Sequence, residues 1–318
     1  MKHHPFTSRR SATVAASGEQ NLITLIRRWL GDVCPPAPFG IGDDCAVLPP
    51  AKHAQLVTTD PVIHGRHFDD TVPARAAGAK LLKRNLSDIA AMGGRPRWAV
   101  ISLALAPDTR LDWLRGFHFG LAGCAREYGV QIVGGDVTEA PKGFFGAFLT
   151  LHGEAAGPRV LTREGARESD AIYVTGRLGG SQSGHHHKFT PRLAEGAWLA
   201  RQKEVVAMMD VSDGVAKDIQ ALTPAGLVAS VWPPLVPVSA AAKLAAGKSG
   251  RPAWEHALTD GEDYELLFVV RSSANVARFA QRWIQAFKTP LTFLGRFQQK
   301  PGPEDVDWSA LHGYEHLR

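Results

Sequence analysis

Five short acidic motifs recur along the chain, each with an aspartate where an apolar or β-rich run gives way to glycine or a small polar residue. They are Gly42-Asp43-Asp44, Thr58-Thr59-Asp60, Asn85-Leu86-Ser87-Asp88, Gly134-Gly135-Asp136 and Asp210-Val211-Ser212-Asp213-Gly214. Mg²⁺ prefers oxygen ligands, keeps several waters, and is usually bound by few carboxylates together with substrate phosphates. If the motifs converge in space, the sequence predicts a Mg²⁺ site that serves a phosphate-bearing substrate.

Three of the motifs also have an interpretation that needs no metal. Asp43 and Asp44 can form an Asx-type turn. Asp88 lies near the end of a predicted helix, where the macrodipole favours a compensating cation, but it could equally be solvated on an exposed turn. Ser212 stands at a predicted helix start, where it could merely cap the helix or leave N–H groups for a phosphate.

Other polar clusters are equally ambiguous. Four acids within residues 260–265 precede an apolar strand, a pattern that also suits a charged hairpin loop. The three consecutive histidines at 185–187 cannot all face one ion, and we interpret them as loop residues. His67 is either an anion contact or a surface histidine.

Familiar nucleotide-binding signatures are absent from the sequence. It has no Gly-x4-Gly-Lys-Ser/Thr loop and no protein-kinase His-Arg-Asp and Asp-Phe-Gly pair, and the nucleophile elbow of hydrolases is absent too. Any chemistry on ATP must therefore use a different phosphate cradle.

Periodicity and turn residues predict a first half of β-α-β-α-β-β order. Ser17 and Gln20 form a capping-box pattern for the first helix, and Asp108 or Thr109 is the expected cap of the third. We expect the last two strands to pair beside each other. The predicted helices span residues 17–31, 75–92 and 111–128, and the predicted strands span residues 55–59, 98–106, 130–133 and 144–152.

The second half again mixes strands and helices, so the predicted class is α/β with mixed sheets and two domains. Residues 157–170 form the junction, and a site in the cleft between the halves, or between subunits, is expected. The predicted division is a disordered tail at 1–16 and domains at 17–155 and 156–318. The predicted strands of this half span residues 171–175, 227–232, 264–270 and 291–297, and the predicted helices span residues 239–246 and 274–287. A brief apolar segment at 208–210 leads to a further helix that begins near residue 212.

Composition narrows the function classes. The 318 residues are 44% apolar, with a formal net charge of +5 and a pI near 9.2. A basic nucleic-acid binder would usually show a dense Lys/Arg run or interleaved aromatics, which this sequence lacks. We expect no nucleic-acid partner and no membrane span. The three cysteines have no metal-ligand spacing, which predicts reduced thiols in a cytoplasmic protein.

The motifs together resemble the thiamine-monophosphate kinase family of the aminoimidazole-ribonucleotide-synthetase-like superfamily. They follow the family order and span nearly the whole chain after residue 17. The matching segments are GIGDDCAVL (40–48), TTDPVIHGRHF (58–68), NLSDIAAMGGRPRWAVISLALAP (85–107), VGGDVTEAP (133–141), VLTREGARESDAIYVTGRLG (160–179), DVSDGVAKDI (210–219), TDGEDYELLF (259–268) and LHGYEHL (311–317).

The resemblance implies a two-domain architecture in which the N-terminal domain binds Mg²⁺ and ATP and forms a barrel with its twin in a homodimer. It also implies direct in-line transfer of the ATP γ-phosphoryl group to thiamine monophosphate, giving thiamine diphosphate and ADP. No side chain would act as a covalent or acid–base catalyst.

The resemblance also assigns roles to individual residues. The implied Mg²⁺ ligands are Asp44, Thr58, Thr59, Asp60, Asp88, Asp136, Asp210 and Asp213. The implied ATP contacts are Gly135, Asp136, Arg163 and Ser212. The implied contacts to thiamine monophosphate are His67, Glu262 and Tyr314.

The chain departs from the family pattern in four places. Lys83-Arg84 replaces a small apolar pair, Asp260 stands where glycine is usual, Gly180 stands where aspartate is usual, and the stretch 184–191 is abbreviated. Two rivals remain within the superfamily, an aminoimidazole-ribonucleotide synthetase and a selenophosphate synthetase. The latter usually carries a reactive Cys or selenocysteine in an N-terminal glycine-rich segment, which this sequence lacks. A nucleic-acid-associated protein is the rival from another class.

Overall fold

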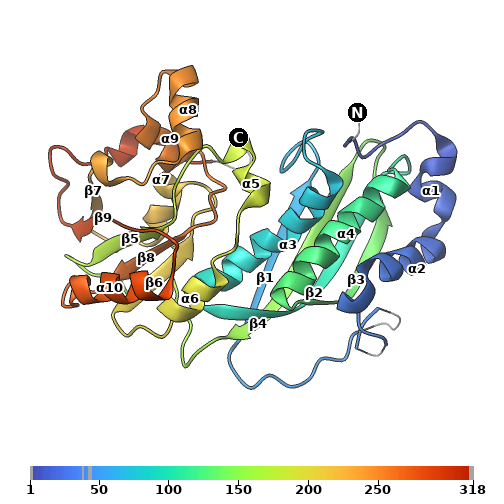
Figure 1. Cartoon of the computed structure of the whole chain (residues 1–318), viewed down its shortest axis with the longest axis horizontal. Coiled ribbons are helices and arrows are strands. Elements are labelled where there is room, and N and C mark those ends of the chain that lie inside the picture. Colours follow the sequence, from blue (N-terminus) through green and yellow to red (C-terminus); the bar gives the residue numbers. More distant parts are fainter. Residues whose placement is uncertain (1–2, 38, 42–44, 315–318) are drawn as a thin grey trace. The chain divides into compact units, whose positions relative to one another are not determined.

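A computed structural model describes residues 3–37, 39–41 and 45–314 of the chain. It divides into two compact units, one of Met1–Ile89 with Arg95–Glu154 and one of Ala90–Gly94 with Ala155–Arg318 (Figure 1). Each unit mixes helices with one sheet, which confirms the predicted α/β class. Among the described residues, no helix combines the length and apolar character needed to cross a bilayer.

Unit 1 is a four-stranded sheet in the order β1-β4-β2-β3. Its strands are β1 (Gln55–Ile63), β2 (Gly94–Leu105), β3 (Gln131–Glu139) and β4 (Phe145–Ala155). β1 runs antiparallel to β4, whereas β2 and β3 are parallel. The prediction that the last two strands pair is wrong, because β2 lies between β3 and β4. A parallel pair needs a crossover, here helix α4, and that crossover leaves β3 at the edge.

Helices α3 (Ala74–Ala91) and α4 (Leu111–Tyr128) cover one face of this sheet (Figure 1). Strand residues alternate between the two faces, so the other face carries every second side chain. On that second face Val57 is 66% exposed, and Phe148 and Val100 are also exposed. Unit 1 therefore presents an apolar strip on three neighbouring strands.

The first helices begin differently from the prediction. Thr13 caps a short helix α1 (Val14–Ser17) by accepting a hydrogen bond from the N–H of Ala16. Ser17 is thus already helical, and the next helix, α2 (Glu19–Leu30), follows Gly18 with no side-chain cap. The predicted capping box does not form, since Gly18 at φ +73° separates the two helices. α4 likewise has no side-chain cap.

Residues 3–16, for which the sequence predicts a disordered tail, are held against the start of α4. The indole N–H of Trp113 donates to the carbonyl of His3 at 2.6 Å, and the N–H of Arg110 donates to Pro5 at 2.7 Å. Val14 is buried. These anchors are mainly backbone carbonyls, which leave no signature in composition.

Buried His118 on α4 makes unfolding depend on pH. Burial lowers its pKa from 6.5 to about 4, while Nδ1 donates to the Leu114 carbonyl at 2.9 Å. His118 of the unfolded chain therefore binds a proton near pH 6.5, whereas His118 of the folded chain binds it only near pH 4. The stability due to neutral His118 is complete above pH 6.5 and is lost as pH falls toward 4.

We expect the free energy of unfolding of the wild type to fall by about 3 kcal/mol more than that of His118→Gln between pH 6.5 and pH 4. Urea unfolding at a series of pH values measures this difference. Exposed His53 supplies the matched control, since His53→Gln should keep the wild-type slope. Equal slopes for wild type and His118→Gln would contradict the assignment.

Unit 2 is a five-stranded antiparallel sheet in the order β6-β8-β5-β9-β7. One face packs against α6 (Leu193–Leu199) and α10 (Val276–Ala286), and the other against α7 (Val215–Asp218) and α9 (Ala253–Thr259). α8 (Ala240–Ser249) adjoins α9. Cores on both faces bury every residue of β5 and β8. The strands are β5 (Ala171–Thr175), β6 (Val205–Asp210), β7 (Val228–Val231), β8 (Leu266–Val270) and β9 (Leu291–Gln298).

Candidate active site

In unit 1, β1 and α3 bring three of the predicted metal ligands together. Alternation along β1 points Thr58 and Asp60 toward α3 and Thr59 toward the other face. The Thr58 hydroxyl donates to Asp88 Oδ2 at 2.6 Å. Thr59 instead donates to the carbonyl of Leu149 at 3.1 Å. Thr58 and Asp88 are therefore direct partners, Asp60 lies on the same face of β1 two residues along, and Thr59 is directed away.

The cation beside Asp60 is Arg84. Arg84 Nη2 lies 3.2 Å from Asp60 Oδ1, and Nη1 donates to the carbonyl of Pro61 at 2.8 Å. Fully buried Asn85 also reaches the Asp60 carbonyl, at 3.4 Å. The basic residue at 84, a departure from the family pattern, thus neutralises one predicted metal ligand directly.

His67 lies in the loop after β1. Its Nδ1 accepts from the N–H of Ile63 at 3.0 Å, and its carbonyl accepts from Lys80 Nζ at 2.6 Å. Lys80 on α3 is completely buried, although sequence reasoning did not single it out. Its position in an Ala-rich helical stretch gives no hint that the ammonium group supports the loop carrying His67.

Gly135 and Asp136 lie on β3 and line a cavity of about 490 Å³ together with Ile101, His118 and residues of α2. A Cβ at Gly135 would clash with the backbone carbonyl of Ile101, so this position requires glycine. Asp136 is exposed. β3 and β1 are opposite edges of the sheet, three strand spacings or roughly 14 Å apart. Asp136 and Asp60 of the same sheet are therefore not neighbours.

In unit 2, the turn after β6 gathers a second set of acids. Asp210 ends the strand with 5% exposure, and Ser212 and Asp213 follow in the turn. Both of their N–H groups donate to Asp218 Oδ2, at 3.0 and 3.1 Å. Burial, with the charges of Asp210 and Asp213, raises the pKa of Asp218 to about 7. Asp218 was not predicted, because an acid inside a short helix looks like an ordinary surface residue.

Ser212 is not the N-cap that the sequence predicts. α7 begins at Val215, and its N-cap is Gly214 at φ +95°. The Ser212 N–H donates to the Asp218 carboxylate, so the turn after β6 is held by a carboxylate of the same chain.

The C-terminal segment lies against this turn. The Tyr314 N–H donates to the Asp213 carbonyl at 2.9 Å. Lys217 Nζ lies 2.6 Å from Asp213 Oδ2 and donates to the Tyr314 carbonyl at 2.9 Å. A predicted metal ligand and a predicted substrate contact are thus neighbours, and Lys217 bridges them.

Glu262 joins the same group. Its N–H donates to the Ser212 carbonyl at 2.7 Å, and its carboxylate accepts from Gln182 at 3.0 Å and from the Tyr264 hydroxyl at 3.2 Å. His186 Nδ1 is 3.9 Å from the Glu262 carboxylate and is largely buried. The histidines at 185–187 are therefore not loop residues, since they form the one-turn helix α5 (His185–Lys188).

The acids around Glu262 have internal partners and do not form a hairpin. Asp263 Oδ1 accepts from the Gly179 N–H at 2.7 Å, and complete burial raises its pKa well above normal. Asp260 Oδ2 accepts from the Gly180 N–H at 2.8 Å, and Oδ1 pairs with His256 at 2.9 Å. Gly180 stands where the family pattern has aspartate, and Asp260 stands where it has glycine. These two positions are thus direct partners.

Two other predicted residues fall outside these groups. Arg163 is exposed in the stretch before β5. Asp44, with the rest of the first acidic motif, lies outside the described residues.

Arg192 and Glu265 anchor the chain after the abbreviated stretch. Arg192 donates to Glu265 through Nε at 2.7 Å and Nη2 at 2.5 Å, and the Thr175 hydroxyl donates to the same carboxylate at 2.6 Å. The Glu265 side chain is only 3% exposed. We expect Arg192→Ala to lower the free energy of unfolding by about 3–5 kcal/mol, because it leaves a buried carboxylate without its cation.

Urea unfolding measures the Arg192 effect, with Glu265→Gln/Arg192→Ala as the matched variant. The double variant should recover most of the loss, since the buried charge is gone. A single variant as stable as the wild type would show that the pair contributes nothing.

Known proteins share both the sequence and the fold. Residues 42–155 match the family model of the N-terminal domain of AIR synthase related protein. The chain is 34% identical over 294 residues to the thiamine-monophosphate kinase of Rhodopirellula baltica, covering 89% of this chain and 90% of that protein.

Two solved structures extend the similarity to three dimensions. The crystal structure of thiamine-monophosphate kinase from Stenotrophomonas maltophilia K279a has a TM-score of 0.72 and 30% identity, covering 90% of this chain and 96% of that one. The structure of AaThiL complexed with AMPPCP and TMP has a TM-score of 0.72 and 29% identity, covering 98% and 100%.

Proposed function

The chain belongs to the thiamine-monophosphate kinase family, and on that premise we propose that it transfers the γ-phosphoryl group of ATP to thiamine monophosphate. The observation that carries the proposal is the similarity over 89% of the chain, within which the acidic motifs form two oxygen-rich groups. The similar AaThiL structure holds AMPPCP and TMP together, as the two substrates of such a reaction would require.

The acidic residues fit Mg²⁺ as the metal. Thr58, Asp60 and Asp88 in unit 1, and Asp210 and Asp213 in unit 2, offer the hard oxygen ligands that Mg²⁺ prefers. We propose that these residues, with Asp44, Thr59 and Asp136, hold several Mg²⁺ ions. Bound Mg²⁺ would neutralise charge on the phosphate oxygens, which phosphoryl transfer needs because both substrates are anions.

The remaining residues would bind and orient the substrates. Gly135, Arg163 and Ser212 are the proposed ATP contacts, and His67, Glu262 and Tyr314 are the proposed contacts to thiamine monophosphate. The acceptor phosphate is already an anion at neutral pH, so direct in-line attack needs little help from a general base. Lys217, which bridges Asp213 and Tyr314, would keep the C-terminal segment in place.

We further propose a homodimer. The apolar strip of Val57, Val100 and Phe148 on the uncovered sheet face supports an interface there. In an eight-stranded barrel made from two such sheets, the edge strands of one copy meet those of the other. β1 and β3 are those edges, and Asp60 and Asp136 each occupy the sixth of nine positions. The strand that carries Asp60 would then adjoin the strand that carries Asp136 of the partner subunit, and we propose that the two aspartates act in one shared site.

We place the reaction in the cytoplasm, which the free thiols of Cys34, Cys45 and Cys124 support. We propose no nucleic-acid partner and no membrane partner.

The direct test combines purified protein, ATP, Mg²⁺ and thiamine monophosphate, with the product identified by mass. We expect thiamine diphosphate and ADP in equal amounts. Unphosphorylated thiamine should give no product, and a chelator should stop the reaction. ATP consumption only with an aminoimidazole-ribonucleotide precursor or with selenide would assign the chain to a rival activity. Steeply salt-dependent DNA binding without ATP turnover would reject an enzyme altogether.

A further inference from the structure

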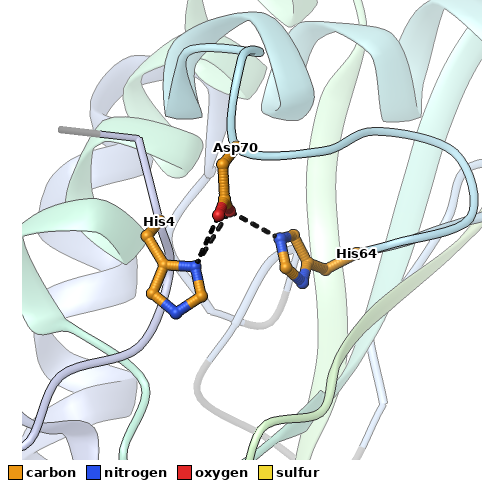
Figure 2. A group of neighbouring side chains, drawn as sticks. All are labelled: His4, His64 and Asp70. Carbon is orange, nitrogen blue, oxygen red and sulfur yellow. Dashed lines mark hydrogen bonds and ion pairs between the residues drawn. The ribbon is translucent and has the colours of Figure 1, made fainter. Parts of the chain in front are cut away.

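Two imidazoles and a carboxylate meet in unit 1, in a group separate from the acidic motifs (Figure 2). His4 comes from the N-terminal segment, His64 directly follows β1, and Asp70 lies in the loop between β1 and α3. His4 Nδ1 lies 2.9 and 3.0 Å from the two Asp70 oxygens, and His64 Nε2 lies 2.9 Å from Oδ1. The three potential ligand atoms all lie within 4.8 Å of one another.

Aromatic side chains hold both imidazoles in orientation. The Phe6 ring packs edge-on against His4 at 5.4 Å and against His64 at 5.5 Å, and Phe68 packs on His64 at 5.5 Å. One ring nitrogen of each imidazole is thereby fixed beside the Asp70 carboxylate.

The donor set differs from that of the proposed Mg²⁺ ligands. Two imidazole nitrogens and one carboxylate suit Zn²⁺ and similar transition metals, whereas Mg²⁺ prefers an all-oxygen site. Zn²⁺ binds both donor types at about 2.0–2.2 Å, which places tetrahedral ligands roughly 3.3 Å apart. The observed nitrogen–oxygen distances of 2.9 Å need to open by only a few tenths of an ångström. Three protein ligands leave the fourth position for water.

We propose that His4, His64 and Asp70 form a site for a divalent transition-metal cation of the Zn²⁺ class. The metal joins the N-terminal segment to the loop of residues 64–70. The same loop carries His67, so the metal restrains the backbone on which a proposed substrate contact lies. The site does not depend on the proposed kinase activity, because none of its three ligands has a role in phosphoryl transfer.

Protection of the N-terminal segment from trypsin provides the test. Arg9 and Arg10 are exposed and lie five and six residues after His4. In chelator-treated full-length protein, added Zn²⁺ should slow cleavage at these arginines several-fold. Mg²⁺ at the same concentration should have no effect. Trypsin activity on a small peptide, measured with and without Zn²⁺, corrects for any effect on the protease. Residues 185–187 could also bind Zn²⁺, but that binding would not protect Arg9.

Variants separate a metal site from a purely hydrogen-bonded His–Asp–His group. His64→Ala and Asp70→Asn should both lose the Zn²⁺ protection, whereas exposed His53→Ala should keep it. Asp70→Asn keeps a hydrogen-bond acceptor, so it removes the anionic ligand without removing the contact. Co²⁺ should give the visible absorption of a tetrahedral complex in wild type and His53→Ala, and this absorption should be weaker in both cluster variants. Zn²⁺ protection that is absent from the wild type, or equal in wild type and both cluster variants, would overturn the proposal.

Discussion

Asp60→Asn and Asp136→Asn should each lower kcat for thiamine diphosphate formation by about 10²–10³, the usual effect of removing one group that stabilises transition-state charge. Both residues are proposed Mg²⁺ ligands, and the amide removes the negative charge while nearly preserving shape. Asp60→Asn also keeps an oxygen for Arg84, whose guanidinium lies 3.2 Å from the carboxylate. Steady-state kinetics at saturating ATP and Mg²⁺ measure the loss.

The matched control for Asp136 is Glu139→Gln, on the same strand and also exposed. It should retain wild-type kcat, because Glu139 has no proposed ligand role. Urea unfolding should show that both aspartate variants remain folded. Near-normal turnover by both at saturating Mg²⁺ would refute the metal assignment, even if the family membership stands.

An equimolar mixture of Asp60→Asn and Asp136→Asn chains should recover about one quarter of wild-type activity, because about half the dimers are mixed and each mixed dimer has one intact site of two. The reason is the strand order, which puts β1 and β3 at opposite edges of one sheet. If Asp60 works with Asp136 of the partner subunit, a mixed dimer has one site with both substitutions and one with neither.

Co-expression with two different affinity tags isolates the mixed dimer for direct assay. A dimer that reassociates without activity would show that both aspartates act within one chain. A strictly monomeric protein would instead reject the proposed interface through Val57 and Phe148. The single variants, assayed alongside, give the background activity with which the mixed dimer is compared.

Gly180 and Asp260, at which glycine and aspartate are interchanged relative to the family pattern, show a limit of interpreting each sequence position separately. Each departs from the family pattern, and nothing in the sequence links them. In the structure the Gly180 N–H donates to the Asp260 carboxylate at 2.8 Å. Gly180 has φ +72°, and a Cβ there would clash with the backbone of Ala241, so an aspartate is excluded at that position. The carboxylate is supplied from residue 260 instead.

Ser212 and His186 show a second limit, which concerns local structure. Ser212 has the residue type of a helix cap, yet Asp218 takes its N–H and the helix starts three residues later. His186 stands in a Gly- and His-rich stretch that reads as a loop, yet it is buried beside the Glu262 carboxylate. Both outcomes depend on residues brought in by the fold, which local patterns do not encode.

The sequence alone predicted the α/β class, the family and the chemical type of the candidate ligands. Those properties reside in hydrophobic periodicity and in ordered short motifs, which act locally and need no knowledge of distant neighbours. Only the tertiary structure decided which groups are neighbours. It paired Thr58 with Asp88, assigned Asp60 and Asp136 to opposite edges of one sheet, and brought His4 to Asp70. Strand order and the path of the N-terminal segment are set by packing between elements far apart in the chain, so no single segment records them.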